Sequence, residues 1–154
     1  MEDGCCSLGY NTVKVKLGGT LIKRLDHIAI AVADIDKAIQ RFLEDFGLNY
    51  KGRESVFAAQ TETAFFPIEG TQIELIHPLD GGGPVKRHLE KRGEGLHHIC
   101  FETDDIIADM AHLKAKGYRF LSEQPKSGAH NTLVAFIHPK SAGGVLIELA
   151  EYQK

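Results

Sequence analysis

A chain of 154 residues with 43% hydrophobic and 25% charged residues has the length and composition of one ordinary globular domain. This composition excludes a disordered or membrane-spanning protein. The formal net charge of −3 at pH 7 and the lack of a long basic run also exclude the electrostatic signature of a binder of nucleic acids or membrane surfaces. We therefore expect a small-molecule partner, with no nucleic acid and no membrane.

The N-terminal segment and the cysteines indicate the cellular compartment in which the protein is located. Residues 1–22 are predicted to be a leader with one short strand at 12–17, and they lack the apolar segment behind a basic start that secretion requires. Cys5 and Cys6 are adjacent and Cys100 lies in an apolar run, which forms neither a disulfide framework nor a metal-binding spacing. We expect a reducing, cytoplasmic location.

An internal repeat follows the leader. The stretch "LDHIAIAVADI" at 25–35 aligns without a gap on "LHHICFETDDI" at 96–106, which pairs His27 with His98. In each copy, alternating apolar residues predict a strand, and an aspartate followed by a helical pattern predicts a capped helix. The chain therefore contains two copies of one structural unit.

The remaining elements of each copy follow its helix. Asp34 and Asp105 are the predicted caps, and Gly47 and Gly117 are predicted to end the helices. Strand-like runs follow at 50–56, 61–67 and 71–77, and at 118–122, 132–137 and 145–150. The predicted fold is α+β, with two tandem βαβββ modules in one cupped mixed sheet. One domain spans 23–152, with module one at about 25–78, a linker helix at about 84–93 and module two at about 95–150.

The pleat of the strands separates the two adjacent histidines. Successive strand side chains point to opposite faces, so His98 faces the side that His27 faces in the first copy. His97 is predicted to be a core histidine with a hydrogen-bond partner. The last strands, "TQIELIHP" and "GVLIELAE", align Glu74 on Glu148 and direct both away from the apolar face. Four polar side chains are therefore expected inside the cup, around a cavity.

Two imidazoles and two carboxylates in one cavity favour a divalent metal. Two buried carboxylates otherwise raise a pKa or cost several kcal/mol, and a dication removes that penalty. Mixed nitrogen and oxygen ligation favours a six-coordinate ion such as Co²⁺, Ni²⁺, Mn²⁺ or Zn²⁺, with positions left for water or substrate. Cys100 is predicted not to be a ligand. Each residue alone is more often a satisfied or solvated side chain, and their recurrence in two copies favours ligation.

Paired βαβββ modules with one His from each first strand and one Glu from each last strand resemble the vicinal oxygen chelate (glyoxalase/bleomycin resistance/dioxygenase) superfamily. Within it, "LDHIAIAV", "ELIHPL", "GLHHIC", "SEQPKSGAH" and "FIHPKSAGGVLIEL" are similar to methylmalonyl-CoA epimerases, from about residue 25 to 152. The resemblance implies an acyl-CoA substrate, a homodimer, and a bound metal with Co²⁺ as first choice. The ligands that it implies are His27, Glu74, His98 and Glu148. Some family members have Gln at the position of Glu74.

The resemblance also implies an isomerase reaction. A 1,1-proton transfer would interconvert the 2R and 2S forms of methylmalonyl-CoA through a metal-stabilised enediolate. Inversion requires an acid/base on each face of the intermediate. Glu148 is the expected group on one face and Glu62, in "TETAFFPI", on the other, although Glu62 also fits a solvated strand residue.

Two other functions remain open at this point. Glyoxalase I (lactoylglutathione lyase) has the same His/Glu/His/Glu set and acts on a glutathione hemithioacetal. A non-catalytic small-molecule-binding protein can share the fold, but such binders generally lack the four ligands. An extradiol dioxygenase is disfavoured, because a fourth protein ligand removes the open positions that O₂ needs.

Overall fold

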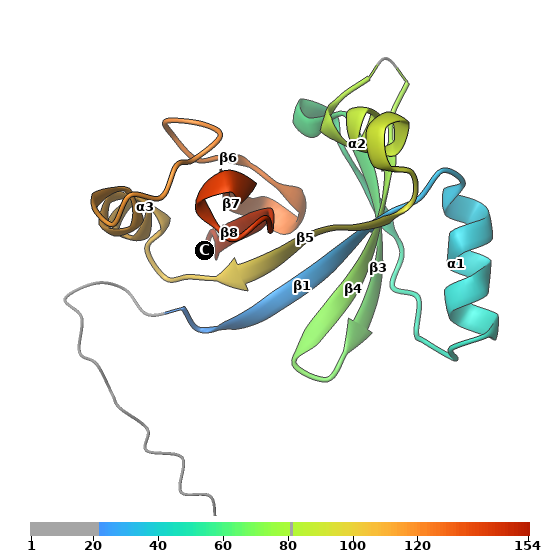
Figure 1. The fold of residues 1–154 in the computed structure, drawn as a ribbon. Coiled ribbons are helices and arrows are strands. Elements are labelled where there is room, and N and C mark those ends of the chain that lie inside the picture. The colour runs from blue at the N-terminus through green and yellow to red at the C-terminus, as the bar shows by residue number, and fades with distance from the viewer. Residues whose placement is uncertain (1–21, 81) are drawn as a thin grey trace, which may run out of the picture.

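The computed structural model describes residues 22–80 and 82–154 (Figure 1). The strand predicted at 12–17, with nearly all of the predicted leader, lies outside these residues. The strands are β1 (Arg24–Ala31), β2 (Arg53–Val56), β3 (Thr61–Ile68), β4 (Thr71–Pro78), β5 (Gly95–Glu102), β6 (Lys126–Ser127), β7 (Thr132–Ile137) and β8 (Ile147–Tyr152). The helices are α1 (Ile35–Glu44), α2 (Pro84–Arg92) and α3 (Ile106–Ala115), with 3-10 turns η1 (Phe57–Ala59), η2 (Ala129–Asn131) and η3 (Pro139–Ser141).

One curled sheet contains all eight of the described strands, in the order β2-β3-β4-β1-β5-β8-β7-β6. The first module supplies the first four strands of this order and the second module supplies the other four. Antiparallel pairing of β1 with β5 joins the modules, while β4 and β8 lie parallel to β1 and β5. The predicted α+β fold of two βαβββ modules in a mixed sheet is confirmed.

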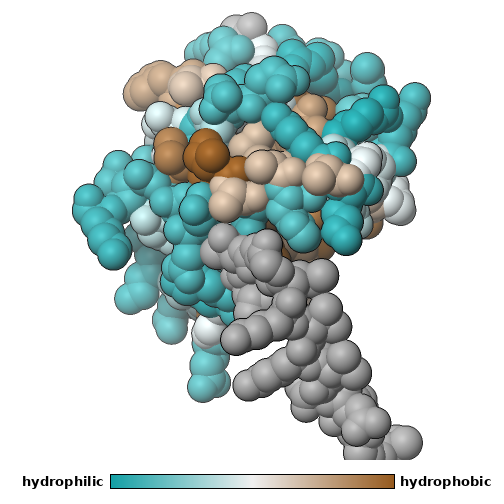
Figure 2. All heavy atoms as spheres, turned by 90° about the vertical axis from the view of Figure 1, so that its left-hand side faces the viewer, coloured by the Kyte–Doolittle hydropathy of each residue, from teal (hydrophilic) through white to brown (hydrophobic). Residues whose placement is uncertain are grey.

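Helices α1 and α3 cover the outside of the curl, and α2 lies at the cavity, which Pro84 and Val85 help to line. In Figure 1, α1 lies beside β3 and β4 on the right, α3 lies beside β6 to β8 on the left, and α2 crosses near the top. The left-hand face is largely hydrophilic, with a small group of apolar side chains (Figure 2). No helix in the described part of the chain is long and apolar enough to span a membrane.

The prediction of a strand at 118–122 is wrong in position. Only an isolated bridge between Phe120 and Ile137 occurs there, and the short strand β6 follows it. The sequence "SEQP" separates the two, and Pro125 has no N–H to donate to a ladder. The second module therefore ends in a much shorter edge strand than the sequence predicted.

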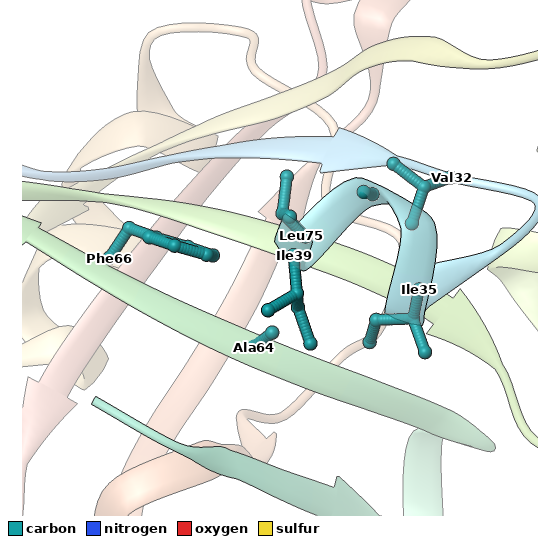
Figure 3. Packing of buried hydrophobic residues seen from close by; sticks show 7 residues of the cluster. Val32, Ile35, Ile39, Ala64, Phe66 and Leu75 are labelled. Atoms are coloured by element: carbon teal, nitrogen blue, oxygen red, sulfur yellow. The ribbon is translucent and has the colours of Figure 1, made fainter. Parts of the chain in front are cut away.

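Apolar contacts fix α1 and α3 on the outer face of the sheet, whereas α2 packs on the inner face against Ala29, Ala31 and Ile76. In the first module, residues at the start of α1 pack against β3 and β4 (Figure 3). The labelled members are Val32, Ile35, Ile39, Ala64, Phe66 and Leu75. A corresponding cluster in the second module contains Ile106, Met110, Ala135 and Leu149. These side chains take the outer face, and the inner face carries a few polar groups among apolar side chains such as Ile76 and Phe136.

The two predicted helix caps are confirmed. Asp34 accepts a hydrogen bond from the backbone N–H of Lys37 at 3.0 Å, and Asp105 accepts one from Ala108 at 2.9 Å. Replacing Asp34 with Ala leaves a backbone donor unsatisfied and should lower the free energy of unfolding by about 1 kcal/mol in urea denaturation. Glu69→Ala, at an exposed turn position, is the control. An equal loss in both variants would contradict the capping role.

Candidate functional site

The inner face of the sheet encloses a cavity of about 190 Å³, lined by residues of both modules. Four of the lining residues are the ligands expected from the sequence: His27 on β1, Glu74 on β4, His98 on β5 and Glu148 on β8. All four are buried. The two modules therefore contribute equivalent polar groups to one enclosed space.

Three donor atoms converge at the centre of this cavity. The Nε2 atoms of His27 and His98 lie 3.1 Å apart. Glu148 Oε2 is 2.6 Å from Nε2 of His98 and 3.2 Å from Nε2 of His27. These three side chains form one of two described groups whose donor atoms lie close enough together to hold one metal ion.

Glu74 lies apart from the three-donor group. Its Oε1 is 3.4 Å from Nδ1 of His27, the ring nitrogen that faces away from the convergent atoms. Gln72 Nε2 donates to the same carboxylate at 2.9 Å. The structure thus brings three of the four predicted ligands together and places the fourth on the other edge of the His27 ring.

The hydrogen bonds around the three convergent atoms are compatible with a bound cation. Nδ1 of His27 faces the acceptor Asp26, which leaves Nε2 of His27 as an acceptor, and Nε2 of His98 is an acceptor when Nδ1 of His98 donates to His97. Glu148 is also only an acceptor when ionised, and three acceptors at this separation need a proton or a cation between them. Burial disfavours a charge on His27, but hydrogen bonds to Asp26 and Glu148 outweigh it and raise the pKa of this imidazole. A divalent ion would meet the same requirement.

Cys100 lies within reach of the same histidine. With Asp26 and His27 it forms a second buried group of potential ligand atoms. Burial, together with the nearby charge of Glu148, raises the pKa of the Cys100 thiol. Because the thiolate is the form that binds metals, a protonated Cys100 is a poor ligand, and the donor set stays nitrogen and oxygen.

Two cavity residues, Asp26 and His97, do not follow the regular alternation of strand side chains between the two faces of the sheet. The pairing of β1 with β5 shifts register between Leu25 and His27, which skips Asp26, and a second shift skips His97 next to His98. Such β-bulges turn the extra residue out of the regular pleat. The prediction that His97 belongs to the core is therefore wrong, because it lines the cavity, whereas its predicted hydrogen-bond partner is present as Nδ1 of His98. Its position in the repeat, aligned with the polar Asp26, was the available signal.

Glu62 does not reach the cavity. Along β3, Thr61 and Thr63 line the cavity, and Glu62 takes the opposite face with Ala64, which packs against α1. Its carboxylate lies 3.5 Å from Nη1 of Arg53. The expected position of Glu62 opposite Glu148 is therefore wrong, because the pleat directs it to the outer face.

A loop residue of the second module contacts β2 and β3 of the first module. His130, in η2, has a left-handed backbone with φ of 52°, a conformation that non-glycine residues adopt only when neighbours hold it. Its ring stacks on Phe65 at a centroid distance of 4.1 Å, and its backbone N–H donates to Glu54 at 3.1 Å. No alternation predicts this contact, because it depends on how far the sheet curls.

Comparisons with known proteins agree with this geometry. Residues 26–136 match the family described as the Glyoxalase/Bleomycin resistance protein/Dioxygenase superfamily. The chain is 40% identical to the ethylmalonyl-CoA/methylmalonyl-CoA epimerase of Cereibacter sphaeroides, over 85% of this chain and 99% of that protein. It is also 40% identical to human mitochondrial methylmalonyl-CoA epimerase, over 83% of this chain and 73% of that protein.

Solved structures show the same likeness. The structure of methylmalonyl-CoA epimerase from Mycobacterium tuberculosis superimposes with a TM-score of 0.83 at 36% identity, covering 90% of this chain and 93% of that chain. A variant of the Streptomyces coelicolor methylmalonyl-CoA epimerase in complex with 2-nitronate-propionyl-CoA gives a TM-score of 0.82 at 32% identity. That match covers 87% of this chain and 100% of the other.

Proposed function

The chain belongs to the glyoxalase/bleomycin resistance/dioxygenase superfamily, and we propose that it is an epimerase that interconverts (2R)- and (2S)-methylmalonyl-CoA. The observation that carries this proposal is the buried group of His27, His98 and Glu148 in a cavity large enough for a small acyl group. Relatives at 40% identity that bear the name methylmalonyl-CoA epimerase support this substrate over a glutathione hemithioacetal.

The same donor group is the proposed metal site. His27, His98 and Glu148 would hold a divalent ion, with Co²⁺ as first choice and Ni²⁺, Mn²⁺ or Zn²⁺ as alternatives, and Glu74 is the proposed fourth ligand. When bound, such an ion acts as a Lewis acid that stabilises negative charge on substrate oxygen atoms. The protein's own part is to orient the α-carbon, exclude water and move the proton.

The surroundings of two carboxylates of the cavity, Glu74 and Glu148, shift their pKa values in opposite directions when no ion is bound. Inversion needs one group that accepts a proton and another that donates one. Burial disfavours the charge of Glu148, but His98 and the hydrogen bonds of both histidines outweigh it and lower its pKa to about 2. Burial raises the pKa of Glu74 to about 7. Carboxylates whose pKa values are pushed apart in this way serve as base and acid.

Glu74 therefore replaces Glu62 as the proposed second acid/base. Glu74 and Glu148 occupy equivalent strands of the two modules, β4 and β8, and line the cavity from both sides of the histidine pair. For one enantiomer Glu148 takes the α-proton and Glu74 returns one to the opposite face. For the other enantiomer the two roles are exchanged.

One experiment tests the function directly. Protein loaded with Co²⁺ is given (2S)-methylmalonyl-CoA in D₂O, and ¹H NMR follows loss of the α-proton while a stereospecific coupled assay follows the 2R product. We expect both exchange and inversion. The same sample is given the hemithioacetal of glutathione and methylglyoxal. Turnover of only the hemithioacetal would identify a glyoxalase, and metal binding without either reaction would identify a binding protein.

We extend the proposal to a cytoplasmic homodimer. The resemblance and the cysteine pattern support this extension, in which acyl-CoA is the partner and nucleic acid and membrane are not. Light scattering after size-exclusion chromatography would measure the mass of the particle against the 17.0 kDa of one chain. A particle with the mass of one chain would contradict the dimer.

A further inference from the structure

The two β-bulges in the β1–β5 pair lie at equivalent positions of the internal repeat. One bulge falls on Asp26, directly before His27, and the other on His97, directly before His98. Each bulged side chain contacts the Nδ1 atom of the histidine that follows it. Asp26 Oδ1 is 2.9 Å from Nδ1 of His27, and Nδ1 of His97 is 2.8 Å from Nδ1 of His98.

A contact at Nδ1 decides what the other ring nitrogen can do. An imidazole ring that is bonded at Nδ1 cannot flip without losing that bond, and a proton held on Nδ1 leaves Nε2 with its lone pair. The Nε2 atoms of His27 and His98 are the ones that meet, at 3.1 Å, in the cavity. The bulged residues therefore account for the orientation of both donors, and Asp26, which can only accept when ionised, also accounts for the tautomer of His27.

Asp26 is itself held on several sides. Its side chain is 3% exposed, and besides His27 it contacts Arg24 Nη2 at 3.1 Å and the Tyr152 hydroxyl at 3.1 Å. A carboxylate with three partners is fixed in place, and its negative charge makes the bonded imidazole a stronger electron donor. His97 offers an imidazole at the equivalent position, which supplies orientation without that charge.

We propose that Asp26 and His97 are positioning residues of the cation site, that each aims one histidine into the cavity, and that Asp26 makes His27 the more strongly donating of the two. This inference rests on the proposed metal-dependent function. It adds to that function a requirement for two cavity residues outside the proposed ligand set, and it assigns them unequal parts.

The test measures Co²⁺ itself as the probe. Asp26→Asn nearly preserves shape and removes the charge, so we expect Co²⁺ affinity, measured by competition with a chromophoric chelator, to fall by about 10- to 100-fold. The visible spectrum of bound Co²⁺ should shift as well, because the field of one ligand changes. His97→Gln, which keeps a polar group near Nδ1 of His98, should lower the affinity less than Asp26→Asn does.

A matched control separates positioning from folding. Asp109 on α3 is a buried carboxylate that bonds Thr103 outside the cavity, and Asp109→Asn should reduce stability in urea while leaving Co²⁺ affinity and spectrum unchanged. Wild-type affinity and spectrum in both Asp26→Asn and His97→Gln would overturn this inference alone. A wild-type chain that fails to bind Co²⁺ or any other divalent ion tested would instead overturn the proposed metal-dependent function.

Discussion

Replacing His98 with Ala is expected to abolish both metal binding and turnover. Nε2 of His98 is the atom nearest to the Glu148 carboxylate, at 2.6 Å, and its loss leaves only two of the three convergent donors. We expect Co²⁺ affinity to fall by more than about 100-fold, the upper end for groups that merely support a ligand. Chelator competition measures the affinity, and the epimerisation assay measures the rate.

The control for this variant is a histidine on the outer side of the fold. His112 lies in the last turn of α3, and His112→Ala should keep the wild-type affinity and rate. If His98→Ala binds Co²⁺ as the wild-type protein does, the assignment of the three-donor group as a metal site is wrong.

Replacing Glu74 with Gln is expected to lower the rate of epimerisation by roughly 10² to 10⁴, the usual contribution of a positioned acid or base. Glutamine keeps the size and polarity of the side chain but cannot carry the proton. In D₂O, the enantiomer whose α-proton faces Glu148 should still exchange without inverting, whereas the other enantiomer should exchange slowly.

Glu62→Gln is the matched variant, because it makes the same chemical change on the outer face of β3. Its rate should stay close to wild type, since Glu62 lies beside Arg53 and not in the cavity. The reverse pattern, a slow Glu62→Gln and a normal Glu74→Gln, would show that the second proton-transfer group is misassigned. In the described part of this chain, the other carboxylates that line the cavity are Asp26 and Glu148.

Much of the fold could be predicted from the sequence because it is repeated. A gapless alignment of two strand-and-helix segments doubles the evidence for each element, and the caps Asp34 and Asp105 mark equivalent helix starts. The short strand β6 could not be predicted in the same way. Its placement depends on where the segment that contains Pro125 can rejoin the sheet, and this is a tertiary property.

The candidate site also contains residues that the sequence could predict and residues that it could not. Simple alternation places His27, His98, Glu74 and Glu148 on one face, and the structure has them all in the cavity. Alternation fails at Asp26 and His97, because a bulge adds a residue that no pattern of hydrophobicity reports. The error at Glu62 is of another kind. Its place was taken from the resemblance, whereas the pleat of its own strand assigns it to the face of Ala64.

The seam between β1 and β5 determines what a fragment of this chain would do. Each is an eight-residue strand, and each would become a free edge if the other module were missing. A long free edge exposes unpaired backbone groups that recruit other chains, so a chain truncated after α2 should aggregate instead of persisting as a small soluble unit. In the intact sheet, the edges that remain exposed are β2 and β6, with four and two residues, too short to template much further pairing.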